Sequence, residues 1–570
     1  MRVLGQYIKK RKLLLLVLCA FFANVSTSLS QTLPVGIPAL EDYYRRIQLI
    51  DTLYQHVSFT IRPLTPKKSL KTNFGYYPDS IQRGYNLLLA DSKWESKNGL
   101  KASLLPLQSQ IQFNSSHPYG WNDGPLIPSK GLQTLLSAGI YSEWGPLSIQ
   151  FQPEIVLANN SPFEGFSEKH YDVLSARYYD FYNQIDLPER FGNEAYGEAY
   201  WGQSSIKLNF DPISIGFSTE NLWWGPGIGT SLLMSNTAPG FKHFTIQTNK
   251  PIQTKFGSFE SQIIAGRPQS SGYGVLEPER TYFGNPLYVP KASGNRYLSG
   301  IIFTWQPKWI KGLFLGFNRT LQLYSEDQNN RIGDYLPLFS PFQPFRADAY
   351  IKSRQQMGGV FFRWLWPESQ MEIYGEWARH NQADNLKTDL LEPERSRAYV
   401  FGLRKALKTT NPSAFFLIAA EVTQLQETNL TDIRRLNSWY INSSIRQGYT
   451  NKGQLIGAGI GPGANLQQVG ISWINGLNRI GLQVERYLHN NDFYYYAYED
   501  SFDFRRHWFD LSLKANGEWS YQNLIFNSQI VATRSYNYGW YLMQNPGDPY
   551  FINGLNKFNL QIQVGATYRF

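Results

Sequence analysis

The chain has 570 residues, a formal net charge of +10 and a mean hydropathy of −0.38. Beyond the first 30 residues, no stretch reaches about eighteen consecutive apolar residues, which excludes helical membrane spans. Aromatic residues make up 16 % of the chain, and this high share favours a transmembrane barrel, which needs aromatic belts at both membrane interfaces.

Residues 1–30 have the pattern of a secretory signal peptide. A basic start precedes an apolar core over residues 13–23, and Ser28 and Ser30 suit cleavage at the end of the segment. Cleavage would remove five basic residues and no acidic one, so the formal charge would fall from +10 to +5. It would also remove Cys19, the only cysteine. No long basic run follows, so nucleic acid is not an expected partner.

Residues 31–99 form an N-terminal segment with one predicted short helix. Acidic residues begin the pattern at Glu41 and Asp42, and Arg45 and Arg46 follow. We expect this amphipathic helix to pack against the periplasmic mouth of a barrel, and the alternative is a docking site for a periplasmic partner. The apolar residues that recur at helical spacing are Leu40, Tyr43, Tyr44, Ile47, Ile50, Tyr54 and Val57.

Residues 100–570 are predicted to form the barrel itself. Apolar and polar residues alternate at every position from Phe558 to Phe570, so one face of this strand is apolar. Glu421 is the only charged residue in the stretch 414–422, and we expect it to face the lumen because a charge facing lipid is costly. Strands are expected near residues 100–113, 131–144, 146–158, 195–209, 212–220, 241–250, 257–267, 296–305, 313–324, 354–365, 369–379, 396–405, 413–424, 467–475, 477–487, 505–515, 519–533 and 557–570.

The connections alternate between tight turns and long loops, as in outer-membrane barrels with periplasmic turns and extracellular loops. The Asn475-Gly476 and Asn516-Gly517 pairs suit two-residue hairpin turns. A further strand at 439–446 would break the alternation, so we predict that 425–466 is one excursion into the lumen or over its mouth. The fold class is therefore all-β, an antiparallel transmembrane barrel of eighteen strands with a short N-terminal periplasmic helix.

The richest stretch for function is the loop at 221–240, with its preceding Glu220. Paired tryptophans and a glycine-rich backbone stand beside amide and hydroxyl side chains, a combination that suits sugars through ring stacking and hydrogen bonds. The alternative is a loop that constricts the lumen, with the tryptophans as its packing core. The candidate residues for glycan binding or a lumen plug are Glu220, Asn221, Trp223, Trp224, Gly225, Pro226, Gly227, Ser235 and Asn236, joined by Arg446 and Tyr449 if the long excursion folds nearby.

Several motifs resemble the capsule-assembly Wzi family. The central one is Glu-Asn-Leu-Trp-Trp-Gly-Pro-Gly at 220–227, and weaker ones are Ser-Phe-Thr-Ile-Arg-Pro at 58–63, Tyr-Gly-Trp-Asn-Asp-Gly at 119–124, Arg-Gln-Gly-Tyr at 446–449 and Gly-Ala-Gly-Ile-Gly-Pro-Gly at 457–463. The resemblance implies an eighteen-stranded outer-membrane barrel that acts as a lectin for exported capsular polysaccharide at the cell surface. This chain departs from the family in having one clear N-terminal helix rather than a helical bundle.

The expected partners are capsular or exopolysaccharide, outer-membrane lipid and, during biogenesis, the barrel-assembly machinery. A transport channel is the main alternative function. A surface hydrolase is a further alternative, for which His489 with Asp492 is the nearest candidate pair. The histidines lack the spacing of a metal pair. We therefore expect no enzyme activity, no metal and no cofactor.

Overall fold

The structure is a computed structural model. It describes residues 31–50, 56–70, 76, 78, 93–328, 332–336, 354–380, 394, 396–411, 413–427, 438–498, 503–542 and 555–570. The predicted signal peptide lies outside these residues. None of the helices in the described part of the chain has the length and apolar composition of a membrane-spanning helix.

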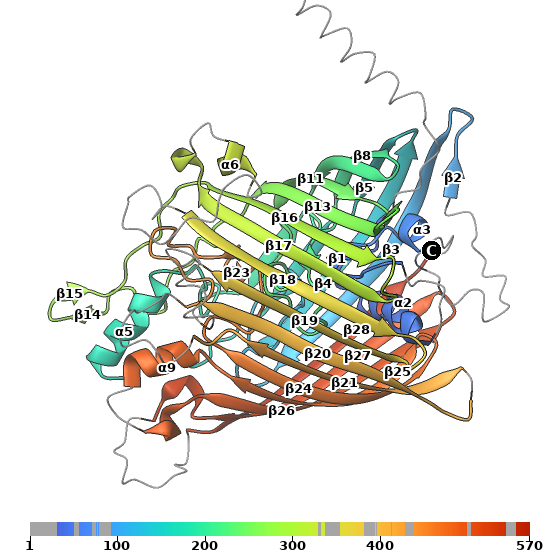
Figure 1. Ribbon diagram of the computed structural model, residues 1–570. Coiled ribbons are helices and arrows are strands. Elements are labelled where there is room, and N and C mark those ends of the chain that lie inside the picture. The colour runs from blue at the N-terminus through green and yellow to red at the C-terminus, as the bar shows by residue number, and fades with distance from the viewer. Residues whose placement is uncertain are drawn as a thin grey trace, which may run out of the picture.

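Eighteen antiparallel strands form a closed barrel, as the sequence predicted (Figure 1). Neighbours in sequence pair with each other, and the last strand closes the barrel on the first. Three of the eighteen are split into two pieces, written here as pairs. The strands are β3 (Leu100–Asn114), β4 (Gly131–Trp144), β5 (Leu147–Phe151) with β6 (Glu154–Ala158), β7 (Tyr196–Tyr200) with β8 (Ser205–Phe210), β9 (Ile213–Ser218), β11 (Lys242–Thr248) with β12 (Ile252–Thr254), β13 (Gly257–Arg267), β16 (Arg296–Pro307), β17 (Leu313–Tyr324), β18 (Arg354–Trp366), β19 (Met371–His380), β20 (Arg397–Lys408), β21 (Ala414–Gln424), β24 (Asn465–Asn475), β25 (Asn478–Leu488), β26 (Phe509–Tyr521), β27 (Leu524–Tyr536) and β28 (Lys557–Tyr568).

Alternation along the strands separates an outward apolar surface from a filled lumen. In β25, Ile480, Leu482 and Val484 are 57 %, 54 % and 57 % exposed, whereas Glu485 is buried. Exposed aromatic residues such as Trp309 gather beside the short turns. An exposed apolar belt of this kind is typical of a transmembrane barrel.

One predicted turn is wrong. Asn516 and Gly517 lie inside β26, where they pair with Gln529 and Ser528, and the hairpin turns instead at Gln522 and Asn523. The odd-numbered residues of β26 keep pointing outward from Leu511 to Tyr521, so the strand runs straight through the Asn-Gly pair. The Asn475-Gly476 turn is displaced by one residue, because Asn475 pairs with Asn478.

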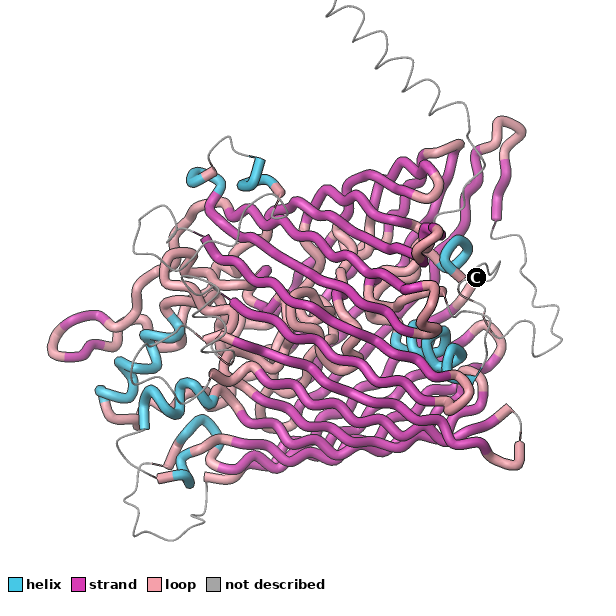
Figure 2. Tube along the Cα trace, viewed as in Figure 1, coloured by secondary structure: helices cyan, strands magenta, loops and turns pink. Residues whose placement is uncertain are grey.

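The remaining elements lie inside the barrel or at its two ends (Figure 2). At the periplasmic end are α2, α3 and β2, which pairs antiparallel with the start of β3, and at the extracellular end are α5, α9 and the β14–β15 hairpin (Figure 1). Their bounds, with those of the other short elements, are α2 (Pro38–Ile50), β1 (Ile61–Arg62), α3 (Pro66–Ser69), β2 (Lys93–Glu95), α5 (Asp172–Tyr182), β10 (Trp223–Trp224), β14 (Thr281–Tyr282), β15 (Asn285–Pro286), η1 (Ser325–Asp327), α6 (Ile332–Tyr335), β22 (Thr450–Asn451), β23 (Gln454–Leu455), α9 (Asn491–Tyr498), η5 (Phe504–Arg506) and η6 (Tyr538–Trp540).

Ion pairs hold α2 within the periplasmic end of the lumen. The buried carboxylate of Glu372 in β19 accepts hydrogen bonds from Arg363 Nε at 2.6 Å, Arg45 Nε at 3.2 Å and Arg404 Nη1 at 3.3 Å. Arg404 also donates to Asp42 of α2 at 2.7 Å. Each guanidinium therefore has an acidic partner, which offsets the cost of burying its charge.

Candidate functional site

The loop at 221–240 is folded into the lumen and joined to the N-terminal segment. Its β10 strand pairs with β1, with Trp224 opposite Ile61 and Trp223 opposite Arg62. The amide of Gly225 extends this pairing by donating to Thr60 O at 2.9 Å. Two sequence motifs that lie more than 150 residues apart thus form one small sheet inside the barrel.

Both tryptophans of the loop are buried among protein atoms. Trp224 is 0 % exposed, and its indole Nε1 donates to Gln262 of β13 at 2.8 Å. Its ring approaches β16 so closely that a Cβ on Gly300 would lie 2.7 Å from it. Trp223 is 3 % exposed and lies under the Arg62 guanidinium, 4.3 Å from the ring centroid. In this conformation neither ring offers a free face for stacking on a sugar.

The tip of the loop is fixed to the barrel wall through carboxylates. Glu421 of β21 faces the lumen, as the sequence predicted, and accepts hydrogen bonds from the amides of Ile228 at 2.8 Å and of Gly229 and Thr230 at 3.0 Å. Gly225 has φ +133°, and a Cβ there would lie 2.6 Å from Glu376 Oε2. The glycines therefore allow a tight backbone path between wall carboxylates, with Pro226 and Gly227 buried in the same turn.

The polar candidates of the loop are engaged within the protein. Glu220 pairs with Lys207 at 2.6 Å, and Asn221 Nδ2 donates to Asn236 Oδ1 at 2.5 Å. Asn236 Nδ2 donates in turn to Asn122 O at 3.0 Å, and Ser235 Oγ donates to Gly457 O at 2.5 Å. The motifs at 58–63, 119–124 and 457–463 thus all meet the central loop.

The excursion fills the space above this loop. β21 pairs directly with β24, and the described residues 439–446 form no strand, which agrees with the prediction of a single excursion. Tyr449 is 0 % exposed and stacks on Tyr440, whose hydroxyl donates to Leu232 O at 2.8 Å. Arg446 lies elsewhere, with hydrogen bonds to the carbonyl oxygens of Asn183 and Val289. Tyr449 therefore lies in the same apolar core as Trp224, whereas Arg446 lies outside that core.

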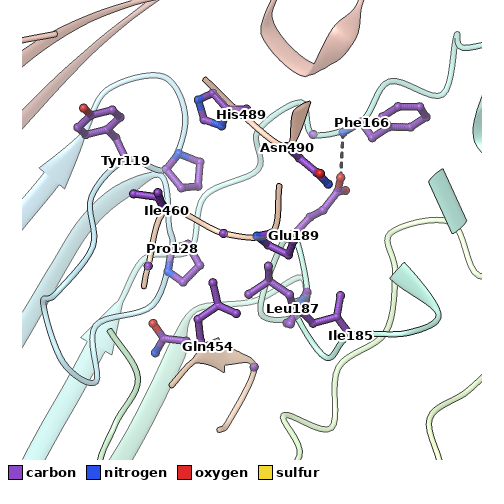
Figure 3. A pocket seen from close by; sticks show the side chains of 18 of the residues that line it. Tyr119, Pro128, Phe166, Ile185, Leu187, Glu189, Gln454, Ile460, His489 and Asn490 are labelled. Carbon is purple, nitrogen blue, oxygen red and sulfur yellow. Dashed lines mark hydrogen bonds between the residues drawn. The ribbon is translucent and has the colours of Figure 1, made fainter. Parts of the chain in front are cut away.

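A partly enclosed cavity of about 310 Å³ borders this plug on its extracellular side (Figure 3). Its walls come from the loops before and after the barrel strands, with Leu187 and Ile460 facing the same space. The aromatic residues that line it are Tyr119, Phe163, Phe166, Tyr178, Phe181, Tyr182, Tyr487, Trp508, Tyr538 and Trp540.

Two carboxylates and several amides supply the polar lining of the cavity. Glu189 accepts a hydrogen bond from Phe166 N at 3.0 Å (Figure 3). It accepts another from the Tyr178 hydroxyl. Asp123 accepts one from Gln112 Nε2 at 3.1 Å. Burial raises the pKa of both carboxyl groups, and these hydrogen bonds offset only part of the rise.

The acidic partner of His489 is not the one that the sequence suggested. His489 Nε2 lies 2.7 Å from Asp510 Oδ2, and its ring stacks on Trp508 with centroids 3.7 Å apart. Asp492 instead accepts hydrogen bonds from Glu427 N and the Ser438 hydroxyl. Neighbours in sequence diverge here because Asn490 has φ +22° and α9 starts at the next residue.

No pattern in the sequence indicated the cavity. Six separate loops supply its lining, and the motifs at 119–124 and 457–463 contribute only part of it. The available signal was the aromatic density of the loops. The stretch 178–182 forms the C-terminal part of α5, and Tyr178, Phe181 and Tyr182 line the cavity.

Together the fold and the site define an outer-membrane barrel with a plugged lumen and an aromatic cavity near its extracellular end. The family model for capsule assembly protein Wzi matches residues 115–532. The chain therefore belongs to the Wzi capsule-assembly family. Curated protein sequences gave no match.

Among solved structures, the chain is similar to Wzi of Escherichia coli, at 13 % identity and a TM-score of 0.59. The alignment covers 95 % of this chain and 100 % of that one, and it supports the fold. That protein is described as an outer-membrane, carbohydrate-binding β-barrel involved in group 1 capsule assembly. OccK7 of Pseudomonas aeruginosa aligns with a TM-score of 0.37 at 9 % identity, over 82 % of this chain and 98 % of its own. Such a low TM-score carries no argument about function.

Proposed function

We propose that this protein attaches or assembles capsular polysaccharide or exopolysaccharide at the outer face of the outer membrane, acting as a lectin. Membership in the Wzi family supports this function. The observation that carries the proposal is the aromatic cavity, which lies beside a filled lumen. Rings bind the C–H faces of sugars. Side-chain amides donate hydrogen bonds to sugar hydroxyl groups and accept them, and carboxylates accept them. A polysaccharide repeats its unit, so weak single contacts can add up across many barrels.

In this proposal the central loop is the plug that supports the cavity. The first part of the loop packs against the barrel wall and β1, and it contains Glu220, Asn221, Trp223, Trp224 and the residues from Gly225 to Gly227. Its last part contacts the neighbouring motifs through Ser235 and Asn236. The loop lines the cavity through Thr237, and the excursion lines it through Gln454 and Ile460. Tyr449 belongs to the same packing, and Arg446 ties the excursion to the extracellular loops.

Replacement of Trp508 tests the glycan role. Trp508 lines the cavity and is only partly buried, so Trp508→Ala should leave the barrel folded. Trp309→Ala, in the exposed belt, is the matched control for loss of one indole. We expect Trp508→Ala to shift polysaccharide from the cell-associated to the shed fraction several-fold, and Trp309→Ala not to do so. Heat-modifiable electrophoretic mobility reports folding, and unchanged retention by a folded Trp508→Ala protein would contradict the proposal.

We also propose outer-membrane lipid and the barrel-assembly machinery as partners. The exposed apolar belt supports the first, and the terminal β28 strand, with its outward Phe558, Ile562, Val564 and Tyr568, supports the second. Deletion of Phe570 should lower the amount of protein in the outer membrane and increase periplasmic degradation. Normal assembly of that variant would show that the terminal aromatic residue is incidental.

The two other functions find less support. A channel needs an open path, whereas the plug and the excursion form one apolar core with the wall. For a hydrolase, His489 with Asp510 is a histidine–acid pair at the cavity. Ser535, which lies beside His117, is 0 % exposed and out of reach of a polymer. The proposal therefore assigns no catalytic residue and no cofactor.

A further inference from the structure

The charged residues that line the cavity are acidic. Asp123 and Glu189 carry carboxyl groups, and among the lining residues that the structure describes, none is a lysine or an arginine. The one basic ring, His489, is already paired with Asp510. Lys514, the cation that acts on Asp123, lies outside the lining and pairs with Glu485 at 3.2 Å.

This lining has different consequences for neutral and anionic sugars. A hydroxyl group can donate to a buried carboxylate or to the side-chain oxygen of Gln454 or Asn490, so a neutral sugar keeps its hydrogen bonds on entering the cavity. A carboxylate on the sugar would lose its hydration without meeting a cation, which is costly. An ionised Asp123 or Glu189 would repel it as well.

The cavity size limits how much of a polymer enters. A volume of about 310 Å³ is at the lower end for small-molecule sites, so it holds roughly one or two sugar units. The rest of the polysaccharide would lie over the extracellular loops of the barrel.

We propose that the cavity selects an uncharged sugar unit of the polysaccharide and rejects a uronic acid or another anionic unit. This inference rests on the proposed function and names the sugar class that the cavity takes. An acidic polysaccharide would then be held through its neutral units, and its charged groups would stay in water.

Polyvalent sugar conjugates test this selectivity. The probes are polyacrylamide conjugates of glucose and of galactose, each matched with the conjugate of its uronic acid, applied to the purified full-length barrel. Each pair differs only by a carboxylate at C6, and polyvalency brings weak binding into range. We expect the neutral conjugates to bind at least about tenfold more tightly, a difference of about 1.4 kcal/mol.

Two substitutions test whether the selectivity arises in the cavity. Glu189→Gln and Asp123→Asn keep the size of each side chain and remove its charge, so each should narrow the ratio of neutral to acidic binding. Glu168→Gln removes the same charge from an exposed position in the loop that carries Glu189, so the ratio should stay unchanged. Heat-modifiable mobility of all three variants controls for folding.

Equal or tighter binding of the acidic conjugates would overturn the inference, as would a ratio that neither cavity variant alters. Absence of binding to every conjugate would also overturn it. Retention of polysaccharide on cells separates the inference from the function that it rests on. If retention depends on the protein while the conjugates show no preference, the attachment function stands and only the selectivity fails.

Discussion

The two ends of the lumen are closed in different ways. At the periplasmic end, Glu372 and Asp42 are surrounded by arginines from the wall and from α2. At the extracellular end, Glu189 and Asp123 have hydrogen-bond donors but no cation in contact among the described residues. Buried carboxylates that are paired with arginines are typical of contacts that hold a structure together. Carboxylates beside a cavity that have no paired cation are typical of a binding site. The difference distinguishes the end that anchors α2 from the end that we propose binds polysaccharide.

The largest effect should come from breaking the periplasmic network. Glu372→Ala leaves Arg45, Arg363 and Arg404 without their shared partner, and we expect a loss of about 5 kcal/mol or more, since breaking one buried pair already costs about 3–5 kcal/mol. Outer-membrane levels and heat-modifiable mobility measure it. Glu164→Ala removes an exposed ion pair with Lys557 and should cost less than about 1 kcal/mol. Equal behaviour of the two variants would mean that the network does not anchor α2.

Loss of the plug's central ring should come next. Trp224→Ala leaves a cavity against β13 and β16, and large-to-small changes of this kind cost about 3–5 kcal/mol. The melting temperature of the folded barrel should fall clearly for Trp224→Ala and little for Trp508→Ala. A Trp224→Ala barrel of normal stability that sheds polysaccharide would instead assign Trp224 a direct role in glycan binding.

Conductance sharpens the comparison by testing whether the lumen is closed. In a planar bilayer the native protein should pass little current, because the plug and the excursion occupy the lumen. Replacing residues 440–463 by a Gly-Ser linker of equal length should raise conductance several-fold. The same replacement over residues 274–285, in the projecting hairpin, should leave it unchanged. Large steady currents through the native protein would favour the channel alternative.

The smallest effects should be opposite responses to pH. Burial alone would raise the pKa of Asp42, but Arg404, Arg46 and Arg479 outweigh it and lower the pKa. Its contribution to stability is therefore present above about pH 3.8, the unfolded value, and lost as pH falls toward the folded pKa. For Glu189, burial raises the pKa, and Glu277 adds to the rise. The contribution of Glu189 to stability is therefore fully present below about pH 4.5, the unfolded value, and is lost as pH rises through its folded pKa.

The matched variants isolate these two responses. Asp42→Asn should remove part of the acid sensitivity of the native protein, and Glu189→Gln part of its sensitivity to rising pH. The temperature at which heat-modifiable mobility is lost, measured between pH 3 and pH 9, reports both. Stability of Glu189→Gln that tracks the native protein across this range would show that the carboxyl is solvated rather than buried.

The barrel could be predicted from the sequence because each strand carries its own period-two pattern. Strand count, the lumenal position of Glu421 and the path of the excursion all followed from that pattern and from turn parity. The Asn516-Gly517 turn failed because turn propensity was weighed above an alternation that continues through it from Leu511 to Tyr521. Long-range pairings such as Trp224 with Ile61 leave no mark on local sequence. The same holds for the cavity, whose lining exists only after six loops converge.

The contacts between the N-terminal segment and the barrel wall affect the order in which the parts of the protein can assemble. α2 leaves the ribosome early, yet Arg404, which binds Asp42, follows 362 residues later, and Arg569, which donates to Tyr76 O at 3.0 Å, is separated from it by 493 residues. Contacts so distant in sequence form late, because a long loop must close first. The N-terminal segment can therefore take its final position only after these later residues have been made, and its contact through Tyr76 waits for Arg569, which follows the last strand.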